Sequence, residues 1–208
     1  MSVIEYRVFQ PSDTDAVAGL LSKAFSKSEP PAVAMGLTEP ELEQFVRLLC
    51  PKAAEERLTI VAAVEGSQIA GVMLSEDFAA LPDFPPGSCS EKFLPIFSML
   101  EGLDQQYRRD REIVPGRYLH LFMLAVDQRF AGQGLAQRMI DACLENGRRK
   151  GFRYAVTEAT GVVSQHVFSK LGFKERFRIS YPDYSFEGQA VFSSIRGHQG
   201  TFLMDFAL

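Results

Sequence analysis

Apolar and polar positions follow a period of two in several short stretches of this chain. In residues 4–9, Ile4, Tyr6 and Val8 fall on one side and Glu5 and Arg7 on the other, which predicts a β-strand. Apolar, β-branched runs predict further strands. These cover residues 58–64, 68–74, 119–126, 151–157, 177–181 and 201–207. Residues 65–67, Glu-Gly-Ser, are predicted to form the turn of a hairpin.

Other stretches have helical spacing. Apolar residues between positions 16 and 25 predict a helix that starts after Pro11-Ser12-Asp13. This helix should end before Pro30, because the residue before a proline is disfavoured in helical geometry. Further helices are predicted over residues 93–107, from residue 135 onward, and over residues 161–171. The aromatic residues of the first of these are interpreted as core rather than as a substrate cage.

One more helix is predicted from its start signal. Thr38 and Glu41 have the spacing of a capping box, and Pro40 suits a first helical turn. Pro51 is expected to break or kink this helix, after which residues 53–57 continue it briefly. Residues 79–90 are rich in proline and are predicted to be a loop.

The most informative stretch joins a strand to a helix through two glycines. The apolar run ends at Asp127 and is followed by Arg129-Phe-Ala-Gly132-Gln-Gly134. Glycines allow a backbone to approach a phosphate closely, and the first amides of a helix favour an anion. The turn is neither the dinucleotide fingerprint, because its sixth position is Gln137, nor a Walker loop. We therefore predict a phosphate-binding turn of another type.

Composition limits the classes of protein. The 208 residues are 46% hydrophobic, which predicts a globular chain. No repeat or linker divides it, so we expect one domain over residues 1–208. The net charge of −4 and the lack of a basic run argue against a nucleic-acid partner and are compatible with a cationic small substrate.

Metals and membranes are not expected partners. Cys50, Cys89 and Cys143 lie far apart without metal-ligand spacing, so no metal site is predicted. No apolar run approaches the ~20 residues of a membrane span, and the start does not have a signal-peptide pattern. We expect a soluble, cytoplasmic protein.

The glycine turn matches R/Q-x-x-G-x-G/A through Arg129, Gly132 and Gly134, and so resembles the pyrophosphate loop of the GNAT superfamily of acyl-CoA-dependent N-acyltransferases. Residues 171–173, Leu-Gly-Phe, resemble the L-G-F that closes a helix in that superfamily. The resemblance implies an α/β (α+β) fold with a mixed, mostly antiparallel sheet of about seven strands flanked by helices. It also implies acetyl-CoA as co-substrate.

The same resemblance implies a set of cofactor-binding residues. The end of the central strand would bind the pantetheine arm, the loop would wrap the pyrophosphate, and strand amides would stabilise the oxyanion. The residues implied are Leu124, Ala125, Val126, Arg129, Ala131, Gly132, Gln133, Gly134, Leu135, Ala136, Ser164 and Phe168.

A second resemblance is to the arylalkylamine (dopamine-type) N-acetyltransferases. The segment S-E-P-P-A-V-A-M-G-L, with Glu29, is similar to their D-E-P-L…G-L segment, in which the glutamate is the general base. The long C-terminal segment after residue 176 is also similar. Without this resemblance, Glu29 would be interpreted as a solvated loop acid.

The acid that protonates the leaving thiolate is less obvious. Many GNAT enzymes have a tyrosine at the position of Phe168, which has no proton to give. Dopamine-type enzymes carry two serines in this region, and the matching positions here are Thr160 and Ser164. The alternative interpretation makes Thr160 a helix cap and Ser164 a polar helix residue.

The sequence leaves the roles of two further residues undecided. His120 is a rival base because imidazole titrates near neutral pH, although a histidine in an apolar strand is commonly a hydrogen-bonded core residue. Glu158, after its strand, is a candidate for an anion of the acceptor site. His166 and His198 are interpreted as surface or structural residues.

The predicted function is acetyl-CoA-dependent N-acetylation of a small primary amine, with Glu29 as base. Residues 79–90 are expected to overlie the acceptor site. One alternative is acetylation of a protein N-terminus or lysine. Another is a non-catalytic acyl-CoA sensor, which the missing tyrosine at Phe168 keeps open. A homodimer is an expectation from the superfamily.

Overall fold

The computed structural model describes residues 3–64, 68–80, 82, 84–85 and 87–208. The turn predicted at residues 65–67 lies outside the described residues, as do three positions of the proline-rich loop. None of the helices in the described part is long and apolar enough to cross a membrane.

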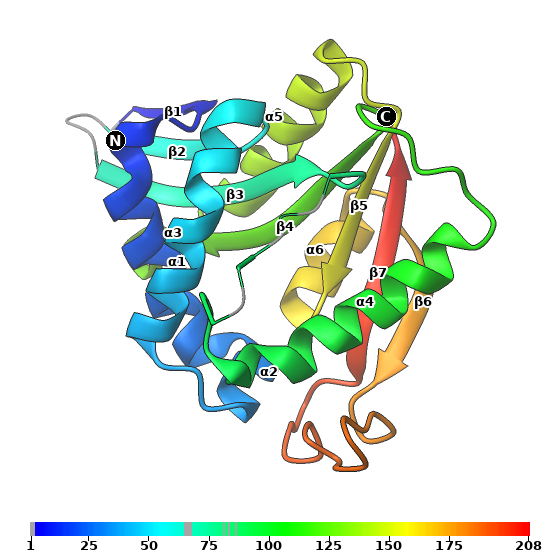
Figure 1. Ribbon diagram of the computed structural model, residues 1–208. Coiled ribbons are helices and arrows are strands. Elements are labelled where there is room, and N and C mark those ends of the chain that lie inside the picture. The colour runs from blue at the N-terminus through cyan, green and yellow to red at the C-terminus, as the bar shows by residue number, and fades with distance from the viewer. Residues whose placement is uncertain (1–2, 65–67, 81, 83, 86) are drawn as a thin grey trace.

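In the described part of the chain, seven strands form one sheet in the order β1-β2-β3-β4-β5-β7-β6 (Figure 1). Only β4 and β5 are parallel, and every other neighbouring pair is antiparallel. The mixed, mostly antiparallel α/β sheet expected from the sequence is confirmed. The strands are β1 (Ile4–Val8), β2 (Ile60–Val64), β3 (Gln68–Asp77), β4 (Tyr118–Val126), β5 (Tyr154–Ala159), β6 (Lys174–Ser180) and β7 (Gly200–Ala207).

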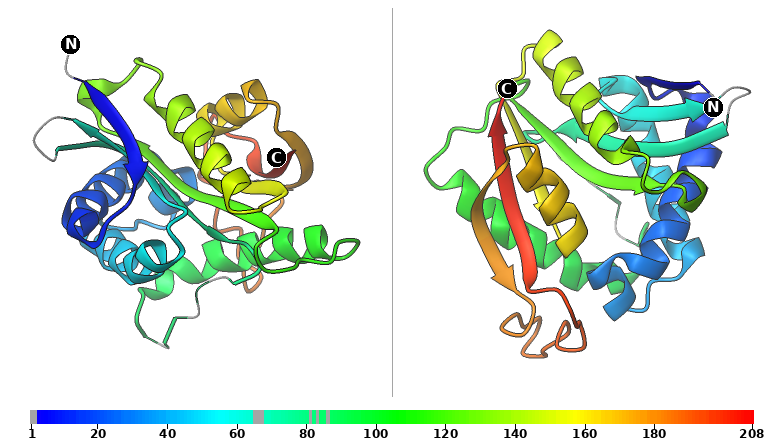
Figure 2. Two further views of the ribbon diagram at one scale, coloured as in Figure 1. Left: turned by 90° about the horizontal axis from the view of Figure 1, so that it is seen from above. Right: turned by 180° about the vertical axis from the view of Figure 1, so that it is seen from behind.

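Among the described residues, six α-helices flank the sheet on both faces (Figures 1 and 2). They are α1 (Thr14–Ser28), α2 (Pro30–Ala34), α3 (Glu39–Glu56), α4 (Leu94–Arg108), α5 (Leu135–Arg149) and α6 (Val162–Lys170). The first four lie on one face, and α5 and α6 lie on the other. Short 3₁₀ turns lie before three of these helices: Pro11–Asp13 before α1, Glu91–Phe93 before α4, and Gln128–Phe130 before the glycine turn and α5.

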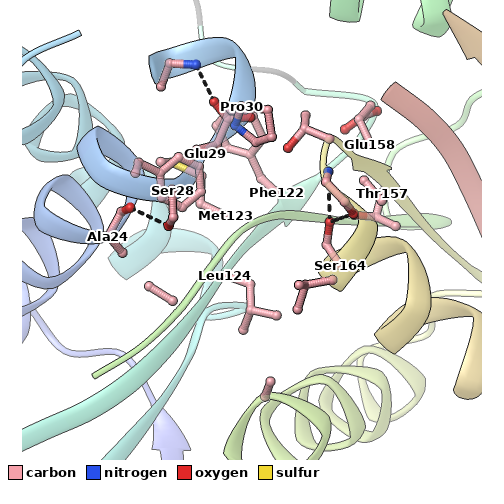
Figure 3. A pocket seen from close by; sticks show the side chains of 18 of the residues that line it. Ala24, Ser28, Glu29, Pro30, Phe122, Met123, Leu124, Thr157, Glu158 and Ser164 are labelled. Carbon is pink, nitrogen blue, oxygen red and sulfur yellow. Dashed lines mark hydrogen bonds between the residues drawn. The ribbon is translucent and has the colours of Figure 1, made fainter. Parts of the chain in front are cut away.

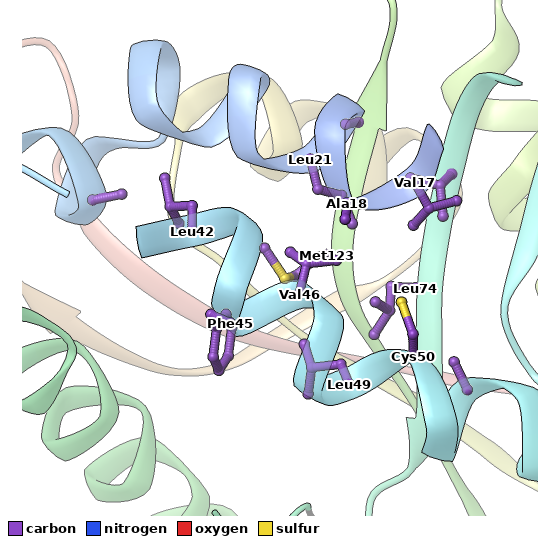
Figure 4. Close-up of a cluster of buried hydrophobic side chains, with 14 of the residues drawn as sticks. Val17, Ala18, Leu21, Leu42, Phe45, Val46, Leu49, Cys50, Leu74 and Met123 are labelled. Carbon is purple, nitrogen blue, oxygen red and sulfur yellow. The ribbon is translucent and has the colours of Figure 1, made fainter. Parts of the chain in front are cut away.

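The larger hydrophobic core lies between α1, α3 and the sheet (Figure 4). Leu21 of α1 and Val46 of α3 are completely buried there, beside Met123 of β4. Burying an aliphatic side chain of this size contributes about 1.5–3 kcal/mol. On the opposite face, α5 packs its apolar stripe, which includes Met139 and Cys143, against the sheet. The apolar residues that recur with helical spacing in the sequence therefore form the face that each helix buries.

The start of α3 is as predicted, but the predicted break at Pro51 is wrong. Thr38 is the N-cap, and its backbone N donates to Oε2 of Glu41 at 2.8 Å, which completes a capping box. The helix continues through Pro51 to Glu56. Buried Cys50 and Ala53 on either side of the proline hold this part of α3 on the core, and Lys52 pairs with Glu56 at 2.6 Å. Tertiary packing therefore offsets the one hydrogen bond that proline cannot donate.

We expect Thr38→Ala to lower the free energy of unfolding by about 1 kcal/mol, because the side-chain half of the capping box is lost. Chemical denaturation at neutral pH would measure the change. Thr38→Ser keeps the capping oxygen and should stay within a few tenths of a kcal/mol of the wild type. Equal loss in both variants would contradict the capping role.

Candidate active site

The two parallel strands β4 and β5 separate after a short paired stretch, as Figure 1 shows. Their last paired residues are His120 and Val156. Just beyond them, the hydroxyl of Thr157 donates to the carbonyl of Leu121 at 2.8 Å. The other edge of β4 stays paired with β3 as far as Val126. On the side that faces β5, the backbone N–H and C=O groups of residues 121–126 therefore have no strand partner in the described sheet.

This opening belongs to a cavity of about 500 Å³. Its wall includes residues 121–126 of β4, residues 157–161 after the strand separation, and parts of all six α-helices of the described chain. Aromatic rings form much of the wall, namely Phe25, Phe45, Phe93, Phe97 and Phe122. Phe93, at the end of the 3₁₀ turn before α4, and Phe97 of α4 pack in the main core and line the cavity as well, so these rings have both positions that the sequence analysis set against each other.

The glycine turn forms one end of the cavity wall. Gly132 and Gly134 have φ angles of +74° and +76°, which disfavour other residues. The first helical hydrogen bond of α5 runs from Arg138 N to Gly134 O at 3.1 Å, so the amides ahead of Arg138 are not donors within the helix. These amides and the helix dipole provide the anion site that the sequence predicts.

The structure brings most of the predicted cofactor-binding residues to this wall. They are Leu124, Ala125, Val126, Ala131, Gly132, Gly134, Leu135, Ala136, Ser164 and Phe168. It does not bring Arg129 and Gln133 there. The Arg129 guanidinium lies 2.6 Å from the Asp127 carboxylate, which is fixed at the start of the turn. These two predicted positions therefore lie on the outer side of the loop.

Glu29 lies at the junction of α1 and α2 and faces the cavity (Figure 3). Its Oε2 accepts a hydrogen bond from Ala32 N at 2.5 Å, so Glu29 caps the short helix α2. Burial raises the pKa of Glu29 to about 7, against the opposing effects of the Thr160 hydroxyl and the Ala32 amide. A carboxylate with this pKa can accept a proton near neutral pH.

Thr160 is held in place from the C-terminal segment. The hydroxyl of buried Tyr181 donates to the Thr160 carbonyl at 2.5 Å and accepts from the Thr201 hydroxyl at 3.1 Å. These contacts place the Thr160 side chain beside Glu29. Sequence reasoning missed Tyr181, and its only signal was a tyrosine at the end of a predicted strand.

The start of α6 shows that the alternative interpretation of Thr160 as a helix cap is wrong. Gly161, and not Thr160, is the N-cap of this helix. Ser164 Oγ donates to Gly161 O at 2.9 Å and accepts from Gly161 N at 3.3 Å, so its hydroxyl is used at the helix start (Figure 3). His198 accepts from Val162 N at 3.2 Å and also faces the cavity. Its interpretation as a structural residue holds, with a place in the cavity wall that the sequence did not indicate.

His120 lies behind the cavity wall rather than in it. Its Nδ1 is 3.1 Å from Glu76 Oε1, and its Nε2 is 2.6 Å from Glu158 Oε2. Burial opposes the charged imidazolium, but the two carboxylates outweigh it and raise the pKa of His120 to about 10. A charged imidazolium with both nitrogens engaged cannot accept a proton. The geometry therefore argues against His120 as the base and for its interpretation as a hydrogen-bonded core residue.

A sheet that opens between two parallel strands, beside a glycine-rich helix start, suits an extended ligand with a phosphate group. The acetyltransferase (GNAT) family matches residues 21–173, which is well over half of the chain. The chain belongs to this family and is an N-acetyltransferase.

Solved structures share this fold over nearly the whole chain. Arylalkylamine N-acetyltransferase 2 from Aedes aegypti is 27% identical, with a TM-score of 0.83 over 98% of each chain. The C-terminal condensation domain of Ebony, in complex with beta-alanyl-dopamine, is 17% identical, with a TM-score of 0.91 over 100% of each chain. A polyamine N-acetyltransferase from Drosophila melanogaster is 19% identical, with a TM-score of 0.79 over 99% of this chain and 100% of its own.

Proposed function

We propose that this protein transfers an acetyl group from acetyl-CoA to the primary amine of a small, arylalkylamine-like molecule. One observation carries the proposal: a single cavity joins the glycine turn, the unpaired edge of β4 and the carboxylate of Glu29. A phosphate site, a strand edge for an amide-bearing arm and a base are the three parts that the reaction needs.

Acetyl-CoA fits the order of these parts. The amides of residues 132–136 suit the pyrophosphate, and the open backbone edge of β4 suits the amide groups of the pantetheine arm. When bound, acetyl-CoA would supply the thioester. Backbone amides at the end of β4, around Leu124 to Val126, would stabilise the negative charge that develops on its carbonyl oxygen.

The class of acceptor amine is proposed from the residues that line the cavity. Several phenylalanine rings line the cavity that Glu29 faces, which suits an amine with an apolar or aromatic body. The similarity to arylalkylamine N-acetyltransferase 2 from Aedes aegypti supports an amine of this class. The likeness to the polyamine enzyme shows the fold and leaves longer amines as the second acceptor class to be assayed.

Glu29 is proposed as the general base. An alkylamine with a pKa near ~10.4 is mostly protonated at neutral pH and must lose a proton before it attacks. Glu29 takes that proton, the neutral nitrogen attacks the thioester carbonyl, and the C–S bond breaks as the amide forms. The second proton of the attacking nitrogen leaves as the intermediate collapses, and the CoA sulfur departs as thiolate or thiol. A pKa of about 7 suits this role at neutral pH.

Many GNAT enzymes use a tyrosine at the position of Phe168 to protonate the leaving thiolate. Phe168 is apolar, so Ser164, which also lines the cavity, is the candidate hydroxyl for this role. Its hydrogen bonds to Gly161 compete with any donation to a thiolate. A thiol with a pKa near ~8.5 also leaves readily without an acid. We therefore expect Ser164→Ala to lower kcat by no more than about tenfold and stability by about 1 kcal/mol. A kcat loss above about a thousandfold in steady-state assays would instead assign the acid to Ser164.

The proposed function is tested by release of CoA thiol from acetyl-CoA with a panel of acceptors. The panel contains tryptamine, dopamine, phenylethylamine, spermidine, free amino acids and a lysine peptide. Turnover on an arylalkylamine supports the proposal. Turnover on the peptide alone would replace it with protein acetylation.

A further inference from the structure

A long connection, residues 181–199, joins β6 to β7 at one end of the sheet (Figure 1). We call it the β6–β7 connection. Connections longer than about 12–15 residues are uncommon unless they have a function. This one is held together by its own contacts, since the rings of Tyr184 and Phe192 stack with their centroids 5.3 Å apart. It also reaches the candidate active site, because His198 lines the cavity.

Tyr181 begins this connection, and its side chain is completely buried. Its hydroxyl accepts from the Thr201 hydroxyl at 3.1 Å and donates to the Thr160 carbonyl at 2.5 Å. The last residue of β5 that pairs with β7 is Ala159, so Thr160 lies just beyond the strand ladder. The Tyr181 hydroxyl therefore holds a backbone position that the strand pairing does not hold.

The backbone that Tyr181 holds lies against the backbone around Glu29. A Cβ at Gly161 would lie 3.6 Å from Cγ of Pro30. The residue that follows Thr160 is therefore close to the residue that follows Glu29. Burial raises the pKa of Glu29 to about 7, and the Thr160 hydroxyl opposes this rise because it stabilises the charged carboxylate. The position of Thr160 therefore affects how easily Glu29 ionises.

We propose that Tyr181 is a positioning residue for the general base, because it fixes Thr160 so that the Thr160 hydroxyl stabilises the ionised carboxylate of Glu29. This inference rests on the proposed function, in which Glu29 takes a proton from the acceptor amine. Tyr181 does not exchange protons itself. Burial raises the pKa of Tyr181 well above its usual value, and the charge of Glu29 adds to the rise, so its hydroxyl stays a donor over the pH range of an assay.

Other groups that titrate near Glu29 can be separated from this effect. Among the described residues of the cavity wall, the other titratable side chains are Glu158 and His198. Glu158 lies 2.6 Å from Nε2 of His120, and His198 accepts from Val162 N at 3.2 Å. The variants below keep all of these side chains. The ratio of variant to wild-type rate at each pH therefore removes their contribution and that of the amine.

Tyr181→Phe removes the hydroxyl and keeps the ring, which packs edge-on against Phe192 with centroids 5.7 Å apart. With saturating acetyl-CoA and the best amine of the panel, the midpoint of the pH profile of kcat should rise by about 0.5–1 unit. The rate should fall by about fivefold near pH 7, and most of this loss should disappear near pH 9, where Glu29 is ionised in both proteins. A merely structural defect would lower the rate by the same factor at every pH.

A double-mutant cycle tests whether Tyr181 acts through Thr160. Thr160→Val removes the positioned hydroxyl and should raise the midpoint at least as much as Tyr181→Phe. The double variant should not exceed Thr160→Val alone, because both changes remove one contact. Thr160→Ser keeps a hydroxyl and should restore the wild-type midpoint to within about 0.3 unit. Additive shifts in the double variant would overturn the proposal.

Tyr184→Phe is the matched control from the same connection. The hydroxyl of Tyr184 donates to the Pro95 carbonyl at 3.1 Å, and Tyr184 is not among the residues that line the cavity. Its loss should leave the midpoint unchanged and kcat within about twofold of the wild type. The same upward shift in Tyr184→Phe would attribute the effect to a loosened connection and overturn the role of Tyr181.

Carbon-13 NMR titration of the Glu29 carboxyl, assigned with Glu29→Gln, measures the same shift without turnover. A raised pKa of Glu29 in Tyr181→Phe would support the positioning role even if no amine is acetylated, an outcome that would remove only the proposed function. If Tyr181→Phe does not fold, Thr201→Val removes the donor to the same hydroxyl and should shift the pKa of Glu29 in the same direction. An unchanged pKa of Glu29 in the folded variant would overturn the proposal.

Discussion

Glu29→Gln is expected to lower kcat for amine acetylation by at least about 100-fold, in the range that a positioned general base contributes. Glutamine keeps the size of the side chain and can still accept the hydrogen bond from Ala32 N. It cannot take a proton from the amine. Steady-state thiol release with the best amine of the panel measures the loss.

The pH profile makes this prediction specific to proton transfer. In the wild type, activity should rise as pH increases through about 7, because Glu29 must be ionised to act as base. The rise near pH 7 should vanish in Glu29→Gln. Glu39→Gln, at an exposed position at the start of α3, should leave both rate and profile unchanged. An unchanged profile in Glu29→Gln would exclude Glu29 as the base.

The same pKa predicts the effect on stability. Because the pKa of Glu29 is raised from its usual value to about 7, the folded protein holds a proton that the unfolded chain has lost. The contribution of Glu29 to the free energy of unfolding is therefore fully present at low pH and is lost as the pH rises toward 7. The loss is at most about 3 kcal/mol, and water in the cavity reduces it. Glu29→Gln should therefore be at least as stable as the wild type at pH 8, which separates lost catalysis from unfolding.

Gly132→Val is expected to weaken binding of CoA by at least about 100-fold, which corresponds to about 2.8 kcal/mol. A Cβ at Gly132 would meet no atom within 4 Å, so the space beside it is open to a phosphate. A branched side chain would fill that space and would keep the phosphate from the loop amides. Titration calorimetry with CoA measures the loss.

A second glycine controls for backbone strain. Gly116, before the start of β4, has a φ angle of +75° and also meets no atom within 4 Å. Gly116→Val therefore carries a similar conformational cost at the end of β4 far from the glycine turn. It should lower stability while CoA affinity stays within about twofold. Equal weakening of CoA binding in both variants would attribute the effect to strain alone.

The sequence by itself determined the elements and the phosphate-binding end of the site. Alternation and apolar runs predicted the seven strands, and helical spacing or a capping signal predicted the α-helices other than α2, because these signals are local in the chain. The glycine turn could be recognised because its function depends on backbone conformation, which glycines at fixed spacing encode locally. Glu29 was noticed only through its resemblance to a family segment, since a loop glutamate has no local signal of burial.

Only the tertiary structure decided the chemistry of the other groups. Pro51 stays helical because the core holds both of its flanks, which no local rule contains. The evidence against His120 as a base comes from its contacts with Glu76 and Glu158, which belong to two other strands. The opening between β4 and β5 likewise depends on residues far apart in the chain. Burial and charge are properties of the folded neighbourhood, so they appear only when the strands and helices are brought together.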